Sequence, residues 1–245
     1  MSKDLKSFFS FHTGKASNFI ELILEAEANF TQEPAEDDES SAKKPVKRMS
    51  TYEVIVHSIL FLVGGFDSNV TTITLASYLL ALNPDTQEKL YREICQVLEK
   101  LAEESEGSEG KDPFELVTVD NVHRFEYLSG VIDETLRIYS PGTALERVAS
   151  RDIHLQNSSG TIQLNIRKGD VVLFPVYSMH RDPEQFPDPE QFKPERFVGV
   201  PANHKYSYLP FGQGPRNCVA RSLSVLQAKL GLLHVVRLFK FSRGE

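Results

Sequence analysis

A single helical pattern over residues 51–83 constrains the fold of this chain more than any other feature. Ser50 and Glu53 have the spacing of a capping box at its start, and Pro84 ends it because the residue before a proline disfavours helical backbone. At about 1.5 Å per residue, such a helix is roughly 50 Å long. Residues 54–63 are apolar almost all round, so we expect this part of the helix to be buried.

Two adjacent glycines, Gly64 and Gly65, interrupt the helical pattern. Each costs about 1 kcal/mol relative to alanine in a helix interior. A buried helix with two such positions indicates a kink or a group that lies close to the backbone. Asp67 and Ser68 follow directly, so the pattern places an acid and an alcohol inside the helix beside this gap.

The remaining periodicities predict a mainly α fold with small β-sheets. Further helices are expected near residues 85–103, 127–138 and 219–239. Short alternating or apolar runs predict strands near residues 153–155, 162–166 and 171–174, and the last of these is expected to be buried.

The distribution of charge and the lengths of the apolar runs argue against nucleic-acid binding and against a membrane-spanning helix. The net charge of −7 comes from the stretch between Glu25 and Glu39, which has seven acids and no base. Residues 31–50 predict a charged surface loop. Nucleic-acid binding is not expected, because no basic stripe is interleaved with aromatic residues. The longest apolar region, residues 54–63, is about half of the roughly twenty residues that a spanning helix needs, so we expect no transmembrane segment.

The chain has only two cysteines, Cys95 and Cys218, which is too few for a disulfide framework and favours a reduced, cytosol-facing setting. Cys95 lies on the apolar face of a predicted helix, and we interpret it as a core residue.

Cys218 follows a proline-rich stretch, residues 181–217, that contains seven of the thirteen prolines and has room for no long helix or strand. An irregular stretch of this length in a compact domain is usually functional. Backbone N–H groups and the helix dipole at the start of the next helix would favour a thiolate at Cys218. Gly212 and Gly214 allow the backbone to approach a ligand closely. The loop alone leaves two interpretations open, a reactive thiolate and a buried structural cysteine.

The loop resembles the haem-binding signature of cytochromes P-450, which has Phe, two residues, Gly, one residue, Arg, one residue and Cys. The matching residues are Phe211, Gly214, Arg216 and Cys218. The resemblance implies that Cys218 is the axial iron ligand, that Arg216 contacts a haem propionate, and that Phe211 and Gly212 belong to the cofactor-binding loop. The chain departs from the family at Ala220, where members often have glycine.

Other segments resemble the family in the same chain order. Glu134 and Arg137 match the E-x-x-R of helix K, and the Pro-Glu-Arg-Phe segment at 194–197 supplies Arg196. The resemblance implies a buried ion-pair network of these three residues beneath the haem, and a structural role for His180. It assigns a second propionate contact to Arg147. The segment around His180 is most similar to the microsomal drug-metabolising group that includes the 3A subfamily.

The helix at residues 51–83 resembles helix I of the family, which crosses the haem. Its Gly64 and Gly65 would then open a groove for dioxygen. Asp67 and Ser68 would be the catalytic acid–alcohol pair that delivers protons during dioxygen activation. Serine replaces the usual threonine at this position, which keeps the hydroxyl donor but adds rotamer freedom.

The resemblance covers nearly the whole chain and implies the C-terminal portion of the fold, from helix H or I to helix L, without the N-terminal half. Residues 219–239 would be helix L. The first functional hypothesis is therefore a haem-thiolate monooxygenase that inserts one oxygen atom into a small apolar organic substrate. Its implied partner is an NADPH-dependent reductase, and its implied location is the cytosolic face of the endoplasmic reticulum, although the membrane anchor is expected to be absent here.

Two alternatives remain open. The chain is a truncated, non-catalytic fragment with weak or no haem binding, or it is a thiol-dependent hydrolase with Cys218 as nucleophile. The hydrolase is disfavoured because no pattern near Cys218 supplies a general base. For an isolated fragment we expect a molten or aggregating state, because the faces of the long helix would be uncovered.

Overall fold

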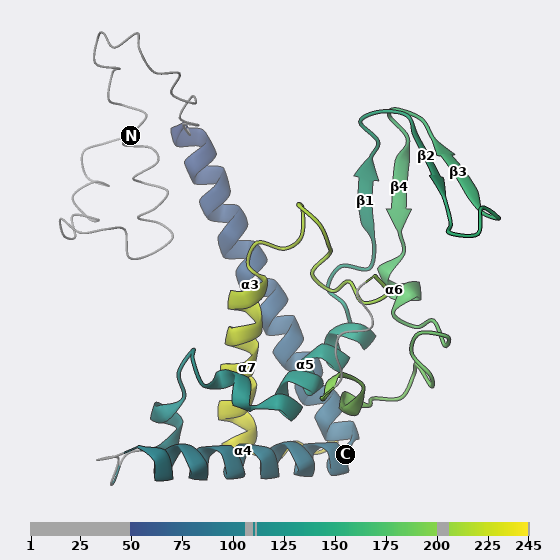
Figure 1. Cartoon of the computed structure of the whole chain (residues 1–245). Helices are drawn as coiled ribbons and strands as arrows, with labels where there is room; N and C mark the ends of the chain where they lie inside the picture. The colour runs from purple at the N-terminus through teal and green to yellow at the C-terminus, as the bar shows by residue number, and fades with distance from the viewer. Residues whose placement is uncertain (1–49, 106–109, 111, 200–205, 245) are drawn as a thin grey trace. The chain divides into compact units, whose positions relative to one another are not determined.

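The computed structural model describes residues 50–105, 110, 112–199 and 206–244 (Figure 1). The chain divides into two compact units, Met1–Phe66 and Asp67–Glu245, and each is considered by itself. The predicted charged loop at 31–50 lies outside the described residues, except for Ser50.

Helix α3, Thr51–Leu82, is the predicted long helix, and its ends lie within one residue of the expected ones. The capping box is confirmed at its start. The Ser50 backbone N–H donates to the Glu53 carboxylate at 2.7 Å, and the Glu53 N–H donates to the Ser50 hydroxyl oxygen at 3.3 Å. At the other end, the Asn83 N–H donates to the Leu79 carbonyl at 3.0 Å.

The apolar side chains in the first half of α3 are exposed, so the prediction that residues 54–63 are buried is wrong in this structure. Leu62 is 73% exposed and Val63 is 60% exposed, and only Val54 of that stretch is buried.

Within the described residues, α3 is the one helix that is long and apolar enough to cross a membrane. Core helices of soluble proteins also meet this criterion of length and composition. The sequence argument against a span counted only the run 54–63 and therefore does not exclude α3.

The described residues of the unit 67–245 pack around a hydrophobic core. It is built from the second half of α3, from α4 (Pro84–Glu104), from α5 (Glu126–Ile138) and from α7 (Arg221–Leu238). Helix α4 packs against both α5 and α7. Leu80, Leu90, Ile94, Leu128 and Leu232 are completely or almost completely buried, and each such side chain contributes about 2 kcal/mol by leaving water. The helices start and end within two residues of their predicted limits.

In the described part of the chain, the small β-sheets are two antiparallel pairs. Strand β1 (Leu145–Val148) pairs with β4 (Val171–Phe174), so that Leu145 lies opposite Phe174. Strand β2 (Ile153–Gln156) pairs with β3 (Gln163–Ile166). The prediction of a buried strand at 171–174 is half right, because β4 forms but Val171 is 63% exposed. With helices dominating and sheets of two strands each, the predicted fold class is confirmed.

The described part of the proline-rich stretch is irregular apart from one short 3-10 helix. After the short helix α6 (Val176–Met179), its regular structure within 181–199 and 206–217 is the 3-10 helix η3, Pro194–Phe197. Two further 3-10 helices, η1 (Pro113–Leu116) and η2 (Val122–Arg124), lie between α4 and α5. Helix α5 packs closely on η3, since a Cβ added at Gly130 would come within 2.7 Å of the Pro194 carbonyl oxygen.

Candidate functional site

The loop before Cys218 is curled by two residues with left-handed backbone. Gly212 has φ of +67° and Gly214 has φ of +84°, a region that residues with a Cβ rarely adopt. The Cys218 N–H donates to the Phe211 carbonyl at 2.8 Å and closes the loop. The sequence therefore needs glycine at both positions to bring the two ends of this loop together.

The Cys218 side chain is a free thiol, and it is exposed. The sequence placed Cys218 at the start of the following helix, but the structure does not. Helix α7 begins at Arg221 and its N-cap is Ala220, so Cys218 lies three residues before the first helical residue. Within the described part of the chain, no hydrogen bond joins the Cys218 thiol to a histidine or a carboxylate. Cys95, expected in the core, is half-buried.

Strand β1 lies beside the Cys218 loop. A Cβ added at Gly212 would be 3.7 Å from Leu145 Cδ1, so Leu145 faces the loop. Side chains two apart on a strand share a face, and Arg147 therefore lies on the face of β1 that carries Leu145. Arg147 is exposed and donates to the Glu146 carbonyl at 2.7 Å. Arg216, in the loop itself, is also exposed.

Glu134, Arg137 and Arg196 come together as an ion-pair network. The Arg137 guanidinium pairs with both carboxylate oxygens of Glu134, at 2.7 and 2.9 Å, and both side chains are 0% exposed. Arg196 Nε lies 3.3 Å from the same carboxylate. The Lys193 backbone N–H also donates to Glu134, at 2.9 Å. Every partner of the buried carboxylate is therefore a donor, as burial of a charge requires.

The remaining donors of Arg137 bind main-chain carbonyls of the irregular stretch. Nη1 donates to the His180 carbonyl at 2.8 Å, and Nη2 donates to the Pro189 carbonyl at 2.7 Å. Arg196 likewise donates to the Asp188 carbonyl at 2.8 Å. These bonds hold a segment without secondary structure against α5. The family resemblance implied the ion pair, but no sequence signal indicated which carbonyls Arg137 binds.

The His180 ring is fully buried and bonded on both sides. Its Nε2 accepts from the Leu209 backbone N–H at 2.8 Å, and its Nδ1 lies 3.2 Å from the Arg137 carbonyl. Burial, together with the positive charges of Arg137 and Arg181, lowers the pKa of His180 from 6.5 to about 4. The ring is therefore neutral near pH 7.

Tyr208 and Asp133 form a second, half-buried contact that no sequence signal indicated. The Tyr208 hydroxyl lies 2.8 Å from the Asp133 carbonyl and 3.0 Å from its carboxylate. Burial raises the pKa of both groups. This contact joins α5 to the chain just before the Cys218 loop.

The residues expected in helix I lie on α3. Asp67 is exposed and Ser68 is half-buried, and the Ser68 carbonyl accepts from the Thr72 hydroxyl at 2.8 Å. Asn69 donates to the Gln227 side chain of α7 at 2.9 Å, a contact that the sequence analysis did not anticipate. A Cβ added at Gly64 or Gly65 would meet nothing within 4 Å, so no described atom requires these glycines.

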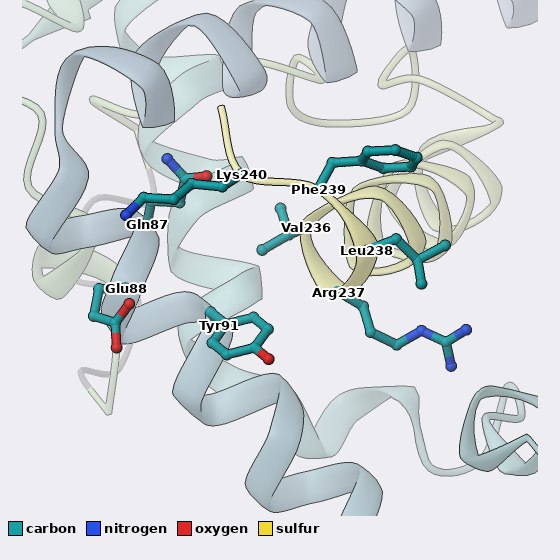
Figure 2. Close-up of a pocket in the computed structure, with 8 residues that line it drawn as sticks. All are labelled: Gln87, Glu88, Tyr91, Val236, Arg237, Leu238, Phe239 and Lys240. Carbon is teal, nitrogen blue, oxygen red and sulfur yellow. The ribbon is translucent and has the colours of Figure 1, made fainter. Parts of the chain in front are cut away.

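A cavity of about 260 Å³ lies between the start of α4 and the end of α7 (Figure 2). Tyr91, Gln87 and Val236 are among the side chains around it. It is separated from Cys218 by the length of α7, about 27 Å for a helix of 18 residues. This cavity is therefore not part of the Cys218 site.

Comparison with known proteins decides the family. The sequence model of cytochrome P450 matches residues 5–245. The chain belongs to the cytochrome P450 family. Similar curated P450s include the probable cytochrome P450 6a13 of Drosophila melanogaster, which is 38% identical over 80% of this chain and 37% of its own length. Cytochrome P450 3A31 of Mesocricetus auratus is 35% identical over 97% of this chain and 44% of its own, and 3A2 of Rattus norvegicus is 36% identical over 91% and 39%.

The chain thus spans about two-fifths of the length of the curated P450s that it matches. Its residues fit the haem that the family implies. The exposed Cys218 sulfur is a suitable iron ligand, and the backbone at Gly214 is open, because a Cβ added there would meet no described atom within 4 Å. Val219, 82% exposed, and Val148, 68% exposed, add apolar surface beside the thiol and on β1.

Proposed function

We propose that this chain supplies the haem-ligand portion of a P450 monooxygenase, which inserts one oxygen atom into a small apolar organic substrate. The observation that carries the proposal is the exposed Cys218 thiol, presented by a loop with left-handed backbone at Gly212 and Gly214. Haem, when bound, supplies the redox chemistry of dioxygen activation, and a thiolate ligand favours cleavage of the O–O bond.

Each remaining site residue has a role in this proposal. Arg216 and Arg147 each pair with a haem propionate, because a guanidinium binds a carboxylate through two parallel hydrogen bonds. Phe211 and Gly212 contact the ring. On α3, Ser68 holds a proton for the reacting oxygen, and the exposed Asp67 exchanges protons with water. Gly64 and Gly65 leave room for dioxygen at the same helix.

The proposed domain is the C-terminal part of a single P450 fold. Residues 51–83 correspond to helix I, 127–138 to helix K and 219–239 to helix L, and residues 181–217 correspond to the irregular segment with the haem loop. Electrons come from an NADPH-dependent reductase, and the protein acts at the cytosolic face of the endoplasmic reticulum. The similarity to 3A proteins supports this assignment.

One observation favours a second candidate, a non-catalytic fragment that binds haem weakly and acts at most as an interaction module. The first half of α3 has large apolar side chains in water, among them Leu60, Leu62 and Phe66, each more than 60% exposed. A surface of this kind is unusual for a protein that functions alone.

Haem binding by the purified chain separates the two candidates. The chain 1–245 is produced with haem, reduced and exposed to carbon monoxide, and its Soret band is recorded. Cys218→Ser and Cys95→Ser form a matched pair, since each removes one of the two thiols. The monooxygenase proposal predicts the red-shifted band of a thiolate-bound haem in the parent chain and in Cys95→Ser, and its loss in Cys218→Ser.

Two results would contradict that proposal. A thiolate-type band that persists in Cys218→Ser shows that another group holds the iron. A parent chain that binds no haem favours the non-catalytic fragment.

A further inference from the structure

His180 lies between the buried ion pair and the Cys218 loop, and the ligand-loop proposal gives it no role. Its contacts fix which nitrogen carries the proton. Since a backbone N–H is always a donor, the bond from Leu209 to Nε2, at 2.8 Å, requires an unprotonated Nε2. Nδ1 then carries the hydrogen and donates to the Arg137 carbonyl at 3.2 Å.

Arg137 and His180 bind each other reciprocally. The Arg137 guanidinium donates to the His180 carbonyl at 2.8 Å, while the His180 ring donates to the Arg137 carbonyl. The Glu134–Arg137 pair therefore determines the position of both the backbone and the ring of His180. Phe186 and Tyr208 lie against the same ring, with centroids at 6.4 and 5.2 Å, and limit its rotation.

Leu209 is the first residue of the turn that leads into the Cys218 loop. Its carbonyl accepts from the Gly212 N–H at 3.1 Å, and the carbonyl of Phe211 accepts from the Cys218 N–H at 2.8 Å. The Leu209 N–H points the other way, to His180. A displacement of Leu209 would therefore move the backbone that closes the loop on Cys218.

We propose that neutral His180 is a positioning residue that ties the Cys218 loop to the Glu134–Arg137 pair through the Leu209 N–H. The Leu209 N–H requires a hydrogen-bond acceptor and the Arg137 carbonyl requires a donor, so the side chain between them must be uncharged and supply one of each. Neutral imidazole meets this requirement, and the neighbouring guanidiniums of Arg137 and Arg181 oppose its protonation. This inference rests on the proposed function in one respect, that the Cys218 loop holds the haem iron.

Two amide substitutions separate the two hydrogen bonds of His180. The amide of His180→Gln reaches the position of Nε2, so it can accept from Leu209. The amide nitrogen of His180→Asn matches Nδ1, so it can donate to Arg137 but does not reach Leu209. Both are polar and neutral, and they differ in the one contact that the proposal needs. His154→Ala is the surface control, because the His154 ring is exposed and bonds only to Asn165 among its described contacts, at 2.6 Å.

The first measurement is made on the chain 1–245 without haem, in a Cys95→Ser background that leaves Cys218 as the single thiol. We measure amide hydrogen exchange of residues 206–218 and the rate at which iodoacetamide alkylates Cys218. In His180→Asn, amide exchange at Leu209 and Gly212 should be on the order of tenfold faster than in the parent. The rate of Cys218 alkylation should also differ from that of the parent. His180→Gln and His154→Ala should match the parent.

Equal effects of His180→Asn and His180→Gln, or no effect of either on residues 206–218, would overturn the positioning role. Because exchange in α4 and α7 is measured in the same samples, general loss of the fold is distinguished from local loosening. A variant that loosens all helices equally also speaks against the proposal.

The second measurement tests the same variants with haem bound. His180→Asn should show a mixture of thiolate-type and other Soret bands, and His180→Gln the thiolate-type band alone. If the parent chain binds no haem, the proposed function fails, but the exchange experiment still decides whether His180 positions the loop.

Discussion

Replacing Arg137 with methionine is expected to remove most of the stability of residues 67–245. Methionine retains the volume of the side chain but none of its donors. Glu134, 0% exposed, keeps only the Lys193 N–H and the more distant Arg196 as partners. An uncompensated buried charge of this kind costs about 3–5 kcal/mol.

The loss extends beyond the ion pair. The carbonyls of His180 and Pro189 also lose their bonds to Arg137, at about 1–3 kcal/mol for each acceptor left unsatisfied. The combined effect is at least about 5 kcal/mol, which is comparable to the total stability of many domains. The buried core described above favours cooperative unfolding of the parent chain over the molten state expected from the sequence. Arg137→Met should abolish this cooperative unfolding or shift it to very low urea.

Urea unfolding of the chain 1–245, followed by far-ultraviolet circular dichroism, measures this effect. The double variant Glu134→Leu, Arg137→Met removes the charge with its partner, so it should be more stable than Arg137→Met alone. Arg92→Met, in a side chain that is 70% exposed and paired with Glu88, is the control and should behave as the parent. A loss below about 1 kcal/mol for Arg137→Met, or a double variant less stable than the single, would refute this account of the network.

Two other substitutions and one titration test the packing. Gly130→Ala should destabilise the chain by about 1–3 kcal/mol, because its Cβ would lie 2.7 Å from the Pro194 carbonyl oxygen; equal or higher stability in urea contradicts the packing of α5 on η3. Gly231→Ala should cost less, since its Cβ would meet only the rotatable Ile73 Cδ1, at 2.9 Å. In the folded chain the pKa of His180 is lowered from 6.5 to about 4. As the pH falls, the unfolded chain therefore binds the proton first. The free energy of unfolding should keep the full contribution of neutral His180 above pH 6.5 and should fall by about 3 kcal/mol as the pH decreases to 4. His180→Gln should flatten this part of the pH profile, and an unchanged profile would assign it to another group.

The sequence predicted the elements well because their signals are local. The capping pair Ser50 and Glu53 and the stop at Pro84 gave α3 its limits to within a residue. The resemblance of two segments to the family, rather than helical spacing alone, identified Glu134, Arg137 and Arg196 as the members of the ion-pair network that the structure brings together.

Burial and main-chain contacts were the parts that the sequence did not predict. Apolar runs such as 54–63 and 171–174 show that a segment can be buried, but not which surface covers it, and both are largely exposed here. The Arg137 bonds to carbonyls and the Leu209 bond to His180 involve backbone atoms, which every residue has. No pattern of side chains could reveal them. The position of Cys218 ahead of α7 was missed for a similar reason, because the turn at 218–220 has no residue that marks it.

Arg137 binds the irregular stretch through atoms that do not depend on side-chain identity. Its bonds to Pro189 and Gln191 end on carbonyl oxygens, at 2.7 and 3.3 Å. Substitutions at these two positions can therefore accumulate without loss of the bonds, provided that the backbone keeps its path. Related proteins should consequently vary freely in the side chains of this segment while its length stays fixed, because an insertion or deletion would move the carbonyls and a substitution would not.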